Sequence, residues 1–230
     1  MMLESFTQIA GQNWSDSDLR EHRVQGSGFT NSQISGSDLR GSVFENCHFT
    51  SVDFTGSALN DTRFVNCQFA SCTLAHASCR SINAADCRFT DVVASGAVLD
   101  EAELHDTIWE RCTLMGASMR RASLINARLT DCDLLGCVLD YSKLDGSVWE
   151  RVRARTASVE FARLEGARIE DSDLSGSSLA GCAASSFMAV NCDLSDADLL
   201  WAELNLDSFH RCAMKNCRYP EPFVVPYGPR

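Results

Sequence analysis

The chain has 230 residues, of which 45% are hydrophobic, and its 31 acidic and 20 basic residues give a formal net charge of −11 at pH 7. This balance disfavours direct nucleic-acid binding, because contacts with phosphates need a basic surface, and it permits a basic protein partner. No apolar run approaches the ~20 residues of a membrane-spanning helix, so we expect no membrane association.

The first segment, residues 1–13, precedes the regular pattern of the chain. It has no basic stretch followed by an apolar run, which predicts a cytoplasmic protein without a signal peptide. The twelve cysteines are therefore expected to be reduced thiols. Phe6 and Ile9 are expected to cap the first coil of the array that follows, because an open end would expose backbone and core.

Residues 14–219 form one array with a period of five. Every fifth residue from Trp14 to Tyr219 is apolar, which gives 42 centre positions. Two residues before the centre, 37 of these 42 pentads have Ala, Ser, Cys, Thr or Val, and eleven of the twelve cysteines lie at this small position. A period of five fits neither a helix nor a strand. It predicts a chain that turns a corner in every pentad, with the centre and the small residue pointing inward.

This pattern resembles the pentapeptide-repeat family, whose motif is a small residue, a polar residue, Leu or Phe and two polar residues. The segments Cys47-His48-Phe49-Thr50 and Ser37-Asp38-Leu39-Arg40-Gly41 match the motif as they stand. The resemblance implies a right-handed quadrilateral parallel β-helix, an all-β solenoid of about ten coils with four pentads each. A glycine two residues after the centre supports this independently, because it recurs at separations that are multiples of 20: Gly36, Gly56, Gly96, Gly116, Gly136 and Gly176.

Interior volume is predicted to be conserved by exchange between the centre and the small position. Four alanine centres have an enlarged residue two positions earlier: Ile82 with Ala84, Val92 with Ala94, Val152 with Ala154, and Phe187 with Ala189. Because protein interiors are close-packed, these large residues are expected to point inward and to replace the missing volume of the centre.

The charges are best compared along columns of residues that lie 20 apart. One column alternates in sign through Asp91, Arg111, Asp131 and Arg151, so its members are expected to pair between successive coils. Unpaired acids are expected in a second column, which forms a candidate acidic strip for a basic partner: Asp53, Asp133, Asp173 and Asp193. A solvated surface without a partner is the alternative for this strip, and Asp18, Asp38 and Asp198 are expected to lie on the adjoining face.

Exposed aromatic residues give the clearest candidate binding surface. Tyr141, Phe161 and Trp201 occupy one outward column in which Gly181 is the remaining member, and Leu200 and Leu206 are expected nearby. Contiguous outward apolar groups are typical of a contact with a partner or a second copy. The alternative is that the C-terminal tail folds back over them. That tail, residues 220–230 with Phe223, Val224, Val225 and Tyr227, is expected to cap the last coil.

Catalytic chemistry is not indicated. The sequence has no nucleophile-elbow, phosphate-loop or zinc-protease motif, and its five histidines share no column. Cys47, Cys67 and Cys87 share a column at a spacing that a disulfide could span, but their parallel inward direction disfavours the bond. A convex rod also offers no cleft in which to shift pKa values. We therefore expect no enzyme, no cofactor and no metal.

The expected function is a non-catalytic protein-binding or adaptor rod that acts through its exterior. The resemblance implies an alternative, because some family members confer quinolone resistance by resembling B-form DNA and binding DNA gyrase. This chain shares their repeat and negative charge, which allows a DNA mimic that protects a type II topoisomerase. It differs from them because its array is uninterrupted, its tail is proline-rich and its acids are interspersed with arginines. A homodimer stays open.

Overall fold

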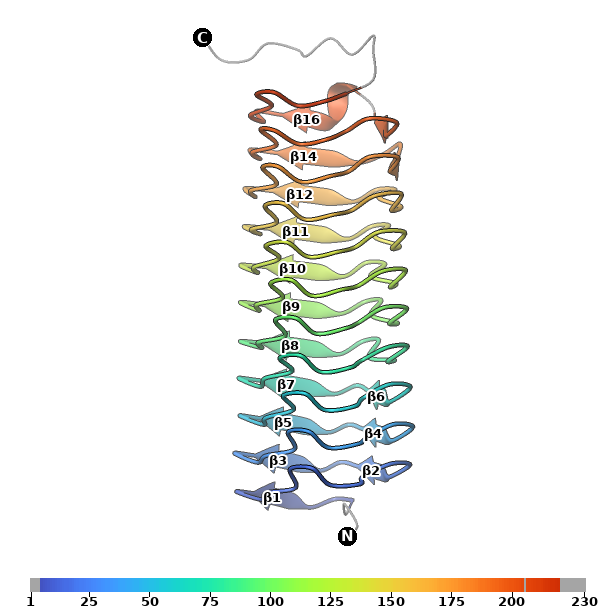
Figure 1. The fold of residues 1–230 in the computed structure, drawn as a ribbon, viewed down its shortest axis with the longest axis vertical. Coiled ribbons are helices and arrows are strands. Elements are labelled where there is room, and N and C mark those ends of the chain that lie inside the picture. Colours follow the sequence, from blue (N-terminus) through green and yellow to red (C-terminus); the bar gives the residue numbers. More distant parts are fainter. Residues whose placement is uncertain (1–4, 205, 220–230) are drawn as a thin grey trace.

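The chain forms a four-sided rod, as the period of five predicts. A computed structural model describes residues 5–204 and 206–219, apart from the side chain of Leu206. The coils are stacked along one axis and rise in a right-handed sense (Figure 1). Residues 20 apart are register partners, as in the pair of Phe29 and Phe49, so one coil contains four pentads.

The largest sheet covers one face of the rod and contains eleven parallel strands. Their order is β1 (Gln8–Ala10), β3 (Gly28–Thr30), β5 (His48–Thr50), β7 (Gln68–Ala70), β8 (Arg88–Thr90), β9 (Ile108–Glu110), β10 (Arg128–Thr130), β11 (Val148–Glu150), β12 (Arg168–Glu170), β14 (Met188–Val190) and β16 (Phe209–His210). A second face has two short sheets, formed by β2 (Arg23–Gln25), β4 (Val43–Glu45) and β6 (Arg63–Val65), and by β13 (Ala183–Ala184) and β15 (Glu203–Leu204). The 3-10 helix η1 (Leu206–Ser208) interrupts the last coil.

On the other two faces, successive coils meet through single parallel bridges. Asp53 bridges to Gln33, for example, and its amide donates to the carbonyl of Ser32 at 3.0 Å. The carbonyl of Asp53 accepts from the amide of Ile34 at 2.7 Å. Each coil thus satisfies backbone groups of its neighbours, which a buried backbone requires.

A left-handed backbone conformation forms the corner that ends each pentad. The residue two positions after the centre has a φ between 49° and 70° at 41 places along the rod. Glycine adopts this conformation without strain, and Asn and Asp tolerate it better than other residues. The glycine column identified in the sequence is therefore one of four such edges.

The interior consists of the centre residues and the small residues, as predicted. Every centre from Trp14 to Leu199 is buried. Many small residues also donate a hydrogen bond to the carbonyl of the centre residue 23 positions earlier, as Ser37 Oγ does to Trp14 at 2.6 Å and Cys137 Sγ does to Leu114 at 2.7 Å. The cysteines are all free thiols, and the eleven at small positions combine a small volume with this donor role, whereas Cys79 is a centre residue.

The predicted volume exchange is confirmed by the burial of the enlarged residues. Phe187 is only 3% exposed and lies beside the fully buried centre Ala189. Its ring meets that of Phe209 edge to face, with the ring centroids 5.9 Å apart. Ile82, Val92 and Val152 are buried in the same way next to their alanine centres.

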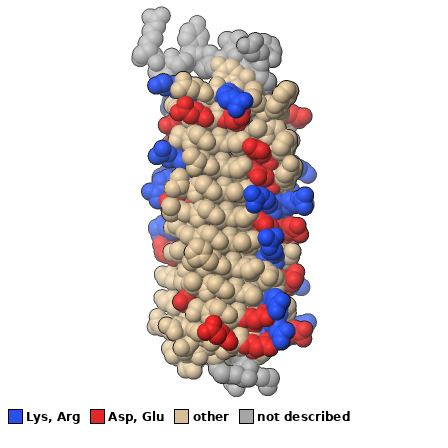
Figure 2. Space-filling view, in the orientation of Figure 1, with Lys and Arg blue, Asp and Glu red and all other residues tan. Residues whose placement is uncertain are grey.

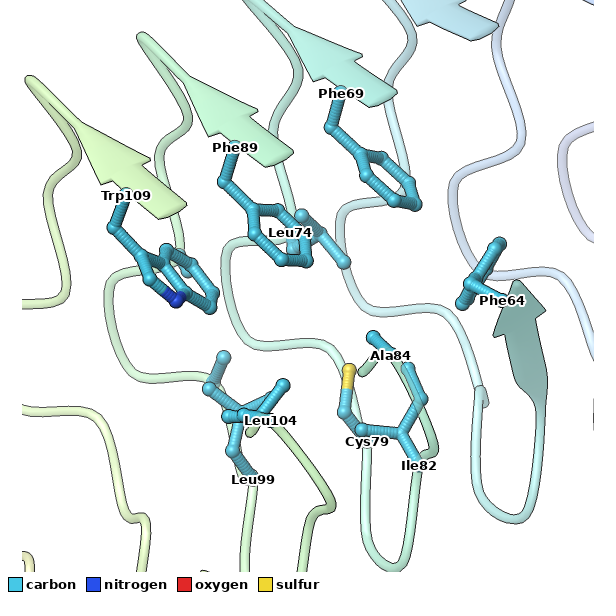
Figure 3. Close-up of a pocket in the computed structure, with 12 residues that line it drawn as sticks. Phe64, Phe69, Leu74, Cys79, Ile82, Ala84, Phe89, Leu99, Leu104 and Trp109 are labelled. Carbon is cyan, nitrogen blue, oxygen red and sulfur yellow. The ribbon is translucent and has the colours of Figure 1, made fainter. Parts of the chain in front are cut away.

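A small apolar cavity lies where several centre residues have small side chains. It measures about 20 Å³, and Figure 3 shows it between the stacked rings of one face and the side chains of Cys79, Ile82 and Ala84. A space of this size could hold about one water molecule, but a wholly apolar lining offers water no hydrogen-bond partner. The cavity is therefore expected to be dry.

The two end segments differ in how far they are described. Within residues 1–13, the strand β1 forms the first rung of the long sheet, and Ile9 occupies a centre position against the core. The expectation that Phe6 caps the first coil with it is wrong, because the Phe6 side chain is 75% exposed. The tail, residues 220–230, lies outside the described residues, as does its predicted capping role. No helix in the described part of the chain is long and apolar enough to cross a membrane.

Candidate partner-binding surface

Four residues of one corner column form a surface that we call the aromatic corner: Tyr141, Phe161, Gly181 and Trp201. The side chains of Tyr141 and Phe161 are 56% and 51% exposed, and that of Trp201 is 79% exposed. The column follows from the fold, because residues 20 apart lie on successive coils. The structure therefore places these sequence-predicted residues together on the outside of four neighbouring coils.

The rings are ordered along this corner. Tyr141 and Phe161 stack with centroids 5.3 Å apart and an angle of 12° between their planes. The next residue, Gly181, has no side chain, and the ring of Phe161 takes that place: a Cβ on Gly181 would lie only 2.6 Å from two carbons of the ring. The Phe161 ring thus lies between Tyr141 and the backbone of Gly181.

The backbone conformation makes aromatic residues costly at this position. Tyr141, Phe161 and Trp201 have φ values of 60°, 55° and 64°. Left-handed backbone costs an L-residue other than Gly, Asn or Asp roughly 1 kcal/mol. Other coils place Gly41, Asp61, Ser81 or Glu101 in the same column and fold in the same way, so coil formation does not require an aromatic ring there.

Small and apolar residues surround the aromatic corner. Leu200, one of the predicted neighbours, is half-buried, whereas Ala183 is exposed. Leu206 begins η1, but its side chain is outside the described residues. The nearby charges are mainly acidic: Glu203 is exposed, and Glu160 accepts a hydrogen bond from Ser178 at 2.9 Å. Arg163 is bound to Asp145 at 3.0 Å.

The predicted acidic strip is less acidic than the sequence indicated. The expectation that its four aspartates are unpaired is wrong for two of them, because Asp133 forms an ion pair with Arg153 at 2.7 Å and Asp173 lies 3.8 Å from Arg155. Asp53 and Asp193 form no ion pair among the described residues. Their carboxylates accept hydrogen bonds from backbone amides two residues later, each at 2.8 Å.

The three acids expected on the adjoining face are also paired. Asp18 and Asp38 bind the arginines two residues later at 2.7 and 2.6 Å, and Asp198 binds Arg218 at 2.8 Å. The hydrogen bonds from Arg20 hold the pKa of Asp18 far below its usual range. Neutralisation by neighbouring arginines therefore leaves no continuous acidic band along these columns.

The alternating column forms the ladder that the sequence predicts. Arg111 binds Asp91 and Arg151 binds Asp131, in both cases through two nitrogens that face the two carboxylate oxygens. Figure 2 shows acidic and basic residues alternating along one margin of the rod, while much of the face between the margins is uncharged. The surface thus mixes both signs of charge with neutral areas.

Metal chemistry finds no support in the described residues 5–204 and 206–219. They contain no group of three or more His, Cys, Asp or Glu side chains that could hold a metal ion.

Burial raises the pKa of the Cys79 thiol to about 12 and that of Cys72 to about 11. Cys212 differs, because a hydrogen bond with Cys192 lowers its pKa to about 7.

Two sequence profiles match the chain, and together they cover about half of it. The profile described as "Pentapeptide repeat region" matches residues 102–179, and the one described as "Pentapeptide repeats (8 copies)" matches residues 27–66. A comparison with curated protein sequences gave no match.

Solved structures with a similar repeat share modest identity with this chain. HetL, a pentapeptide repeat protein involved in heterocyst differentiation regulation in the cyanobacterium Nostoc, is 22% identical, with 93% of this chain and 88% of HetL covered and a TM-score of 0.39. QnrB1, a plasmid-mediated fluoroquinolone resistance protein, is 19% identical, with 95% and 92% covered and a TM-score of 0.31. A pentapeptide repeat protein from the Arabidopsis thaliana thylakoid lumen is 26% identical, with 39% and 59% covered and a TM-score of 0.30.

Proposed function

We propose that this chain, which belongs to the pentapeptide-repeat family, is a non-catalytic rod that binds a protein partner through its aromatic corner. One observation carries the proposal: three large aromatic side chains are exposed at corner positions where their backbone conformation is unfavourable. Every corner of the rod has this conformation, but other coils fold with Gly, Asp or Ser there, so costly aromatic residues that the fold does not require are a reason to infer function. Exposed Tyr and Trp are also the residues that contribute most to protein interfaces.

Mimicry of DNA is the second candidate function. Its support is the net charge of −11 on an uninterrupted rod. The ion pairs of Asp133, Asp173 and Asp198 count against it, because a phosphate-like surface requires acids whose charge is not neutralised nearby. We therefore place the protein-binding rod first.

The first experiment identifies a partner and tests its dependence on the aromatic corner. Proteins that co-purify with the tagged full-length chain from its own host would be compared for wild type, Phe161→Ser and Trp201→Ser. The matched control is Phe6→Ser, because Phe6 is 75% exposed, has a φ of 57° and leans over Gly26 much as Phe161 leans over Gly181. It lies on another edge near the N-terminal end of the rod.

We expect a captured protein, purified and titrated against each variant, to lose about tenfold or more in affinity with Phe161→Ser and Trp201→Ser. Phe6→Ser should bind like wild type. Equal affinity for all four proteins would contradict the aromatic corner as the binding surface. A dimer in sedimentation that Trp201→Ser dissociates would identify the partner as a second copy.

A DNA gyrase supercoiling assay with a fluoroquinolone separates the two candidates. Protection of supercoiling at a low concentration of this chain would favour the DNA mimic. Supercoiling that stays inhibited, together with a partner that depends on Trp201, would favour the binding rod.

A further inference from the structure

One column of small positions contains two pairs of cysteines on successive coils. Cys112 and Cys132 form the inner pair, and Cys192 and Cys212 form the end pair, which lies near the C-terminal end of the rod. In each pair a hydrogen bond joins the two thiols. Both thiols of the inner pair are buried, whereas Cys212 is half-buried. Of the two pairs, only the end pair therefore has a thiol that a reagent in solution can reach.

The backbone brings Cys192 and Cys212 within the range of a disulfide. Asp193 and Ala213, the residues that follow them, form a parallel bridge, and the amide of Ala213 donates to the carbonyl of Cys192 at 2.9 Å. Register partners on parallel strands are about 4.8 Å apart, and a disulfide joins Cα atoms that are roughly 4.4–6.8 Å apart. The Cβ atoms of a disulfide are closer, at about 3.5–4.5 Å, so one coil has to move slightly toward the other.

The position of Cys212 at the end of the rod permits this movement. Figure 1 shows β16, which precedes Cys212, at the C-terminal end of the stack, and within the described part of the chain its sheet ends there. Cys132, in contrast, lies between two coils: its thiol is bonded to Cys112, and its carbonyl accepts from the amide of Arg153 at 2.9 Å. Movement of an inner coil would strain contacts on its other side, so the inner cysteines are expected to stay thiols.

We propose that Cys192 and Cys212 form a reversible disulfide when the protein is exposed to hydrogen peroxide. The thiolate of Cys212 attacks one peroxide oxygen, the O–O bond breaks, and Cys212 becomes a sulfenic acid as hydroxide leaves. The sulfur of Cys192 then attacks the sulfur of Cys212, the S–OH bond breaks, and the S–S bond forms as the Cys192 proton and the hydroxide leave as water. In total, the two thiols lose two electrons and two protons, and one hydrogen peroxide becomes two water molecules.

The environments of the two thiols assign these roles. Cys212 is accessible, and the hydrogen bond with Cys192 lowers its pKa to about 7, so a large share of it is thiolate at neutral pH. The same hydrogen bond raises the pKa of Cys192, which is 2% exposed and keeps its proton until Cys212 has reacted. An accessible thiol with a lowered pKa beside a second cysteine is typical of redox-sensing sites.

The disulfide would close a loop that contains part of the candidate binding surface. The chain between Cys192 and Cys212 includes Trp201 and the 3-10 helix η1. A disulfide stabilises a protein mainly by restricting its unfolded chain, so the oxidised end coil should open less often than the reduced one. This inference concerns a modification of the rod and does not depend on the proposed partner binding.

The experiment exposes the reduced full-length chain to hydrogen peroxide at neutral pH. Unreacted thiols would be alkylated with iodoacetamide in urea, and the tryptic peptides would be analysed by mass spectrometry without reduction. Cleavage after Arg211 and Lys215 places Cys212 in a short peptide of its own, apart from Cys217. Fragmentation of the linked peptide distinguishes Cys192 from Cys182, which lies in the same tryptic peptide.

We expect the bond between Cys192 and Cys212 to form at least about tenfold faster than one between Cys112 and Cys132. The inner pair is the matched control, because it lies in the same column and its hydrogen bond likewise lowers the pKa of Cys132, yet it is buried. Dithiothreitol should restore both thiols of the end pair.

Two further controls separate accessibility from pairing. Cys217 is also half-buried, but its register neighbour in the preceding coil is Ala197, so it should stay a thiol. Cys192→Ser removes the second thiol of the end pair, and the buried Ser172 shows that serine fits this column. In that variant Cys212 should still be oxidised and should accumulate as a sulfenic acid that dimedone traps, without an internal disulfide.

Several results would overturn the proposal. One is oxidation of Cys112 and Cys132 as fast as the end pair. Another is a bond from Cys212 to Cys217 or to a second chain in place of the bond to Cys192. A wild-type Cys212 that proceeds to sulfinic acid without forming a disulfide would overturn it as well. So would a Cys212 that stays reduced at a peroxide concentration that oxidises free cysteine in the same solution.

Discussion

Replacing Phe187 with alanine tests the exchange of volume between the centre and the small position. Phe187 is 3% exposed, and its neighbour Ala189 is too small to fill the space that the ring would leave. Losing the buried ring costs about 2 kcal/mol of transfer free energy. A void of roughly 80 Å³ adds about 2 kcal/mol at ~24 cal/mol per Å³. Phe187→Ala should therefore lower the free energy of unfolding by about 3–5 kcal/mol.

The matching rescue distinguishes packing from a general loss of structure. Ala189 is the register partner of Ile169 and Phe209, so a phenylalanine there would restore the usual large centre of this column. We expect Ala189→Phe alone to be destabilising through overpacking, by about 1–3 kcal/mol, and the double variant with Phe187→Ala to regain at least about 2 kcal/mol relative to additivity.

Urea unfolding, followed by circular dichroism, measures all three variants against wild type. For a chain of this length, each kcal/mol of lost stability lowers the melting temperature by about 2–4 °C, so Phe187→Ala should also melt about 10 °C lower than wild type. Phe187→Ala could leave the urea midpoint unchanged, or the double variant could lose as much free energy of unfolding as the two single variants together. Either result would refute the idea that the two positions share one interior volume.

Three further outcomes follow from the structure. Trp201→Asn should raise the free energy of unfolding by about 0.5–1 kcal/mol in urea titrations, because Asn tolerates the left-handed backbone better; destabilisation would show that the exposed ring packs on the rod. Ala84→Val should raise the free energy of unfolding by about 0.5–1.5 kcal/mol, because the larger side chain fills part of the apolar cavity. A lower melting temperature for this variant would mean that the cavity cannot accept two more carbon atoms. Iodoacetamide should label Cys212 first in the folded protein and Cys79 only on unfolding. Because the thiolate reacts and the Cys212 pKa is lowered to about 7, mass spectrometry should show its labelling slow as the pH falls below 7; labelling of Cys79 at a similar rate would contradict its burial.

The fold was predictable because one period in the sequence specifies every coil. The unbroken series of apolar centres sets which side chains are buried, and glycines such as Gly96 and Gly116 recur at the coil length. The corner conformation was only partly predictable, because Asn, Asp, Ser and Arg hold it at most places and leave no clear signal. The donor role of the cysteines was also missed, since a thiol and a hydroxyl at the small position differ little in a pattern of sizes.

The ion pairs show why surface charge was harder to predict than the core. Comparison along one column correctly paired Arg111 with Asp91, yet Arg153, in the same column as Asp133, was not counted as its partner. Arg155 reaches Asp173 from another column, 18 residues away. A long arginine side chain spans several columns, whereas a buried centre contacts only its fixed neighbours. The length and direction of each arginine side chain therefore decide which acidic side chains remain without an ion pair, and the five-residue period does not specify them.

The separation of stability from binding follows from the geometry of the corners. Each coil contacts only the coils next to it, so a change at an exposed corner has a local effect on stability. Trp201 is largely exposed and is held in a conformation that Asn would accept more readily. If the aromatic ring serves a partner, Trp201→Asn must improve folding and impair binding in the same molecule. A ring retained for packing would have to show the opposite pair of effects, because its loss would then weaken the coil and leave the partner's affinity unchanged. Measuring both quantities on this one variant therefore decides what the aromatic corner is for.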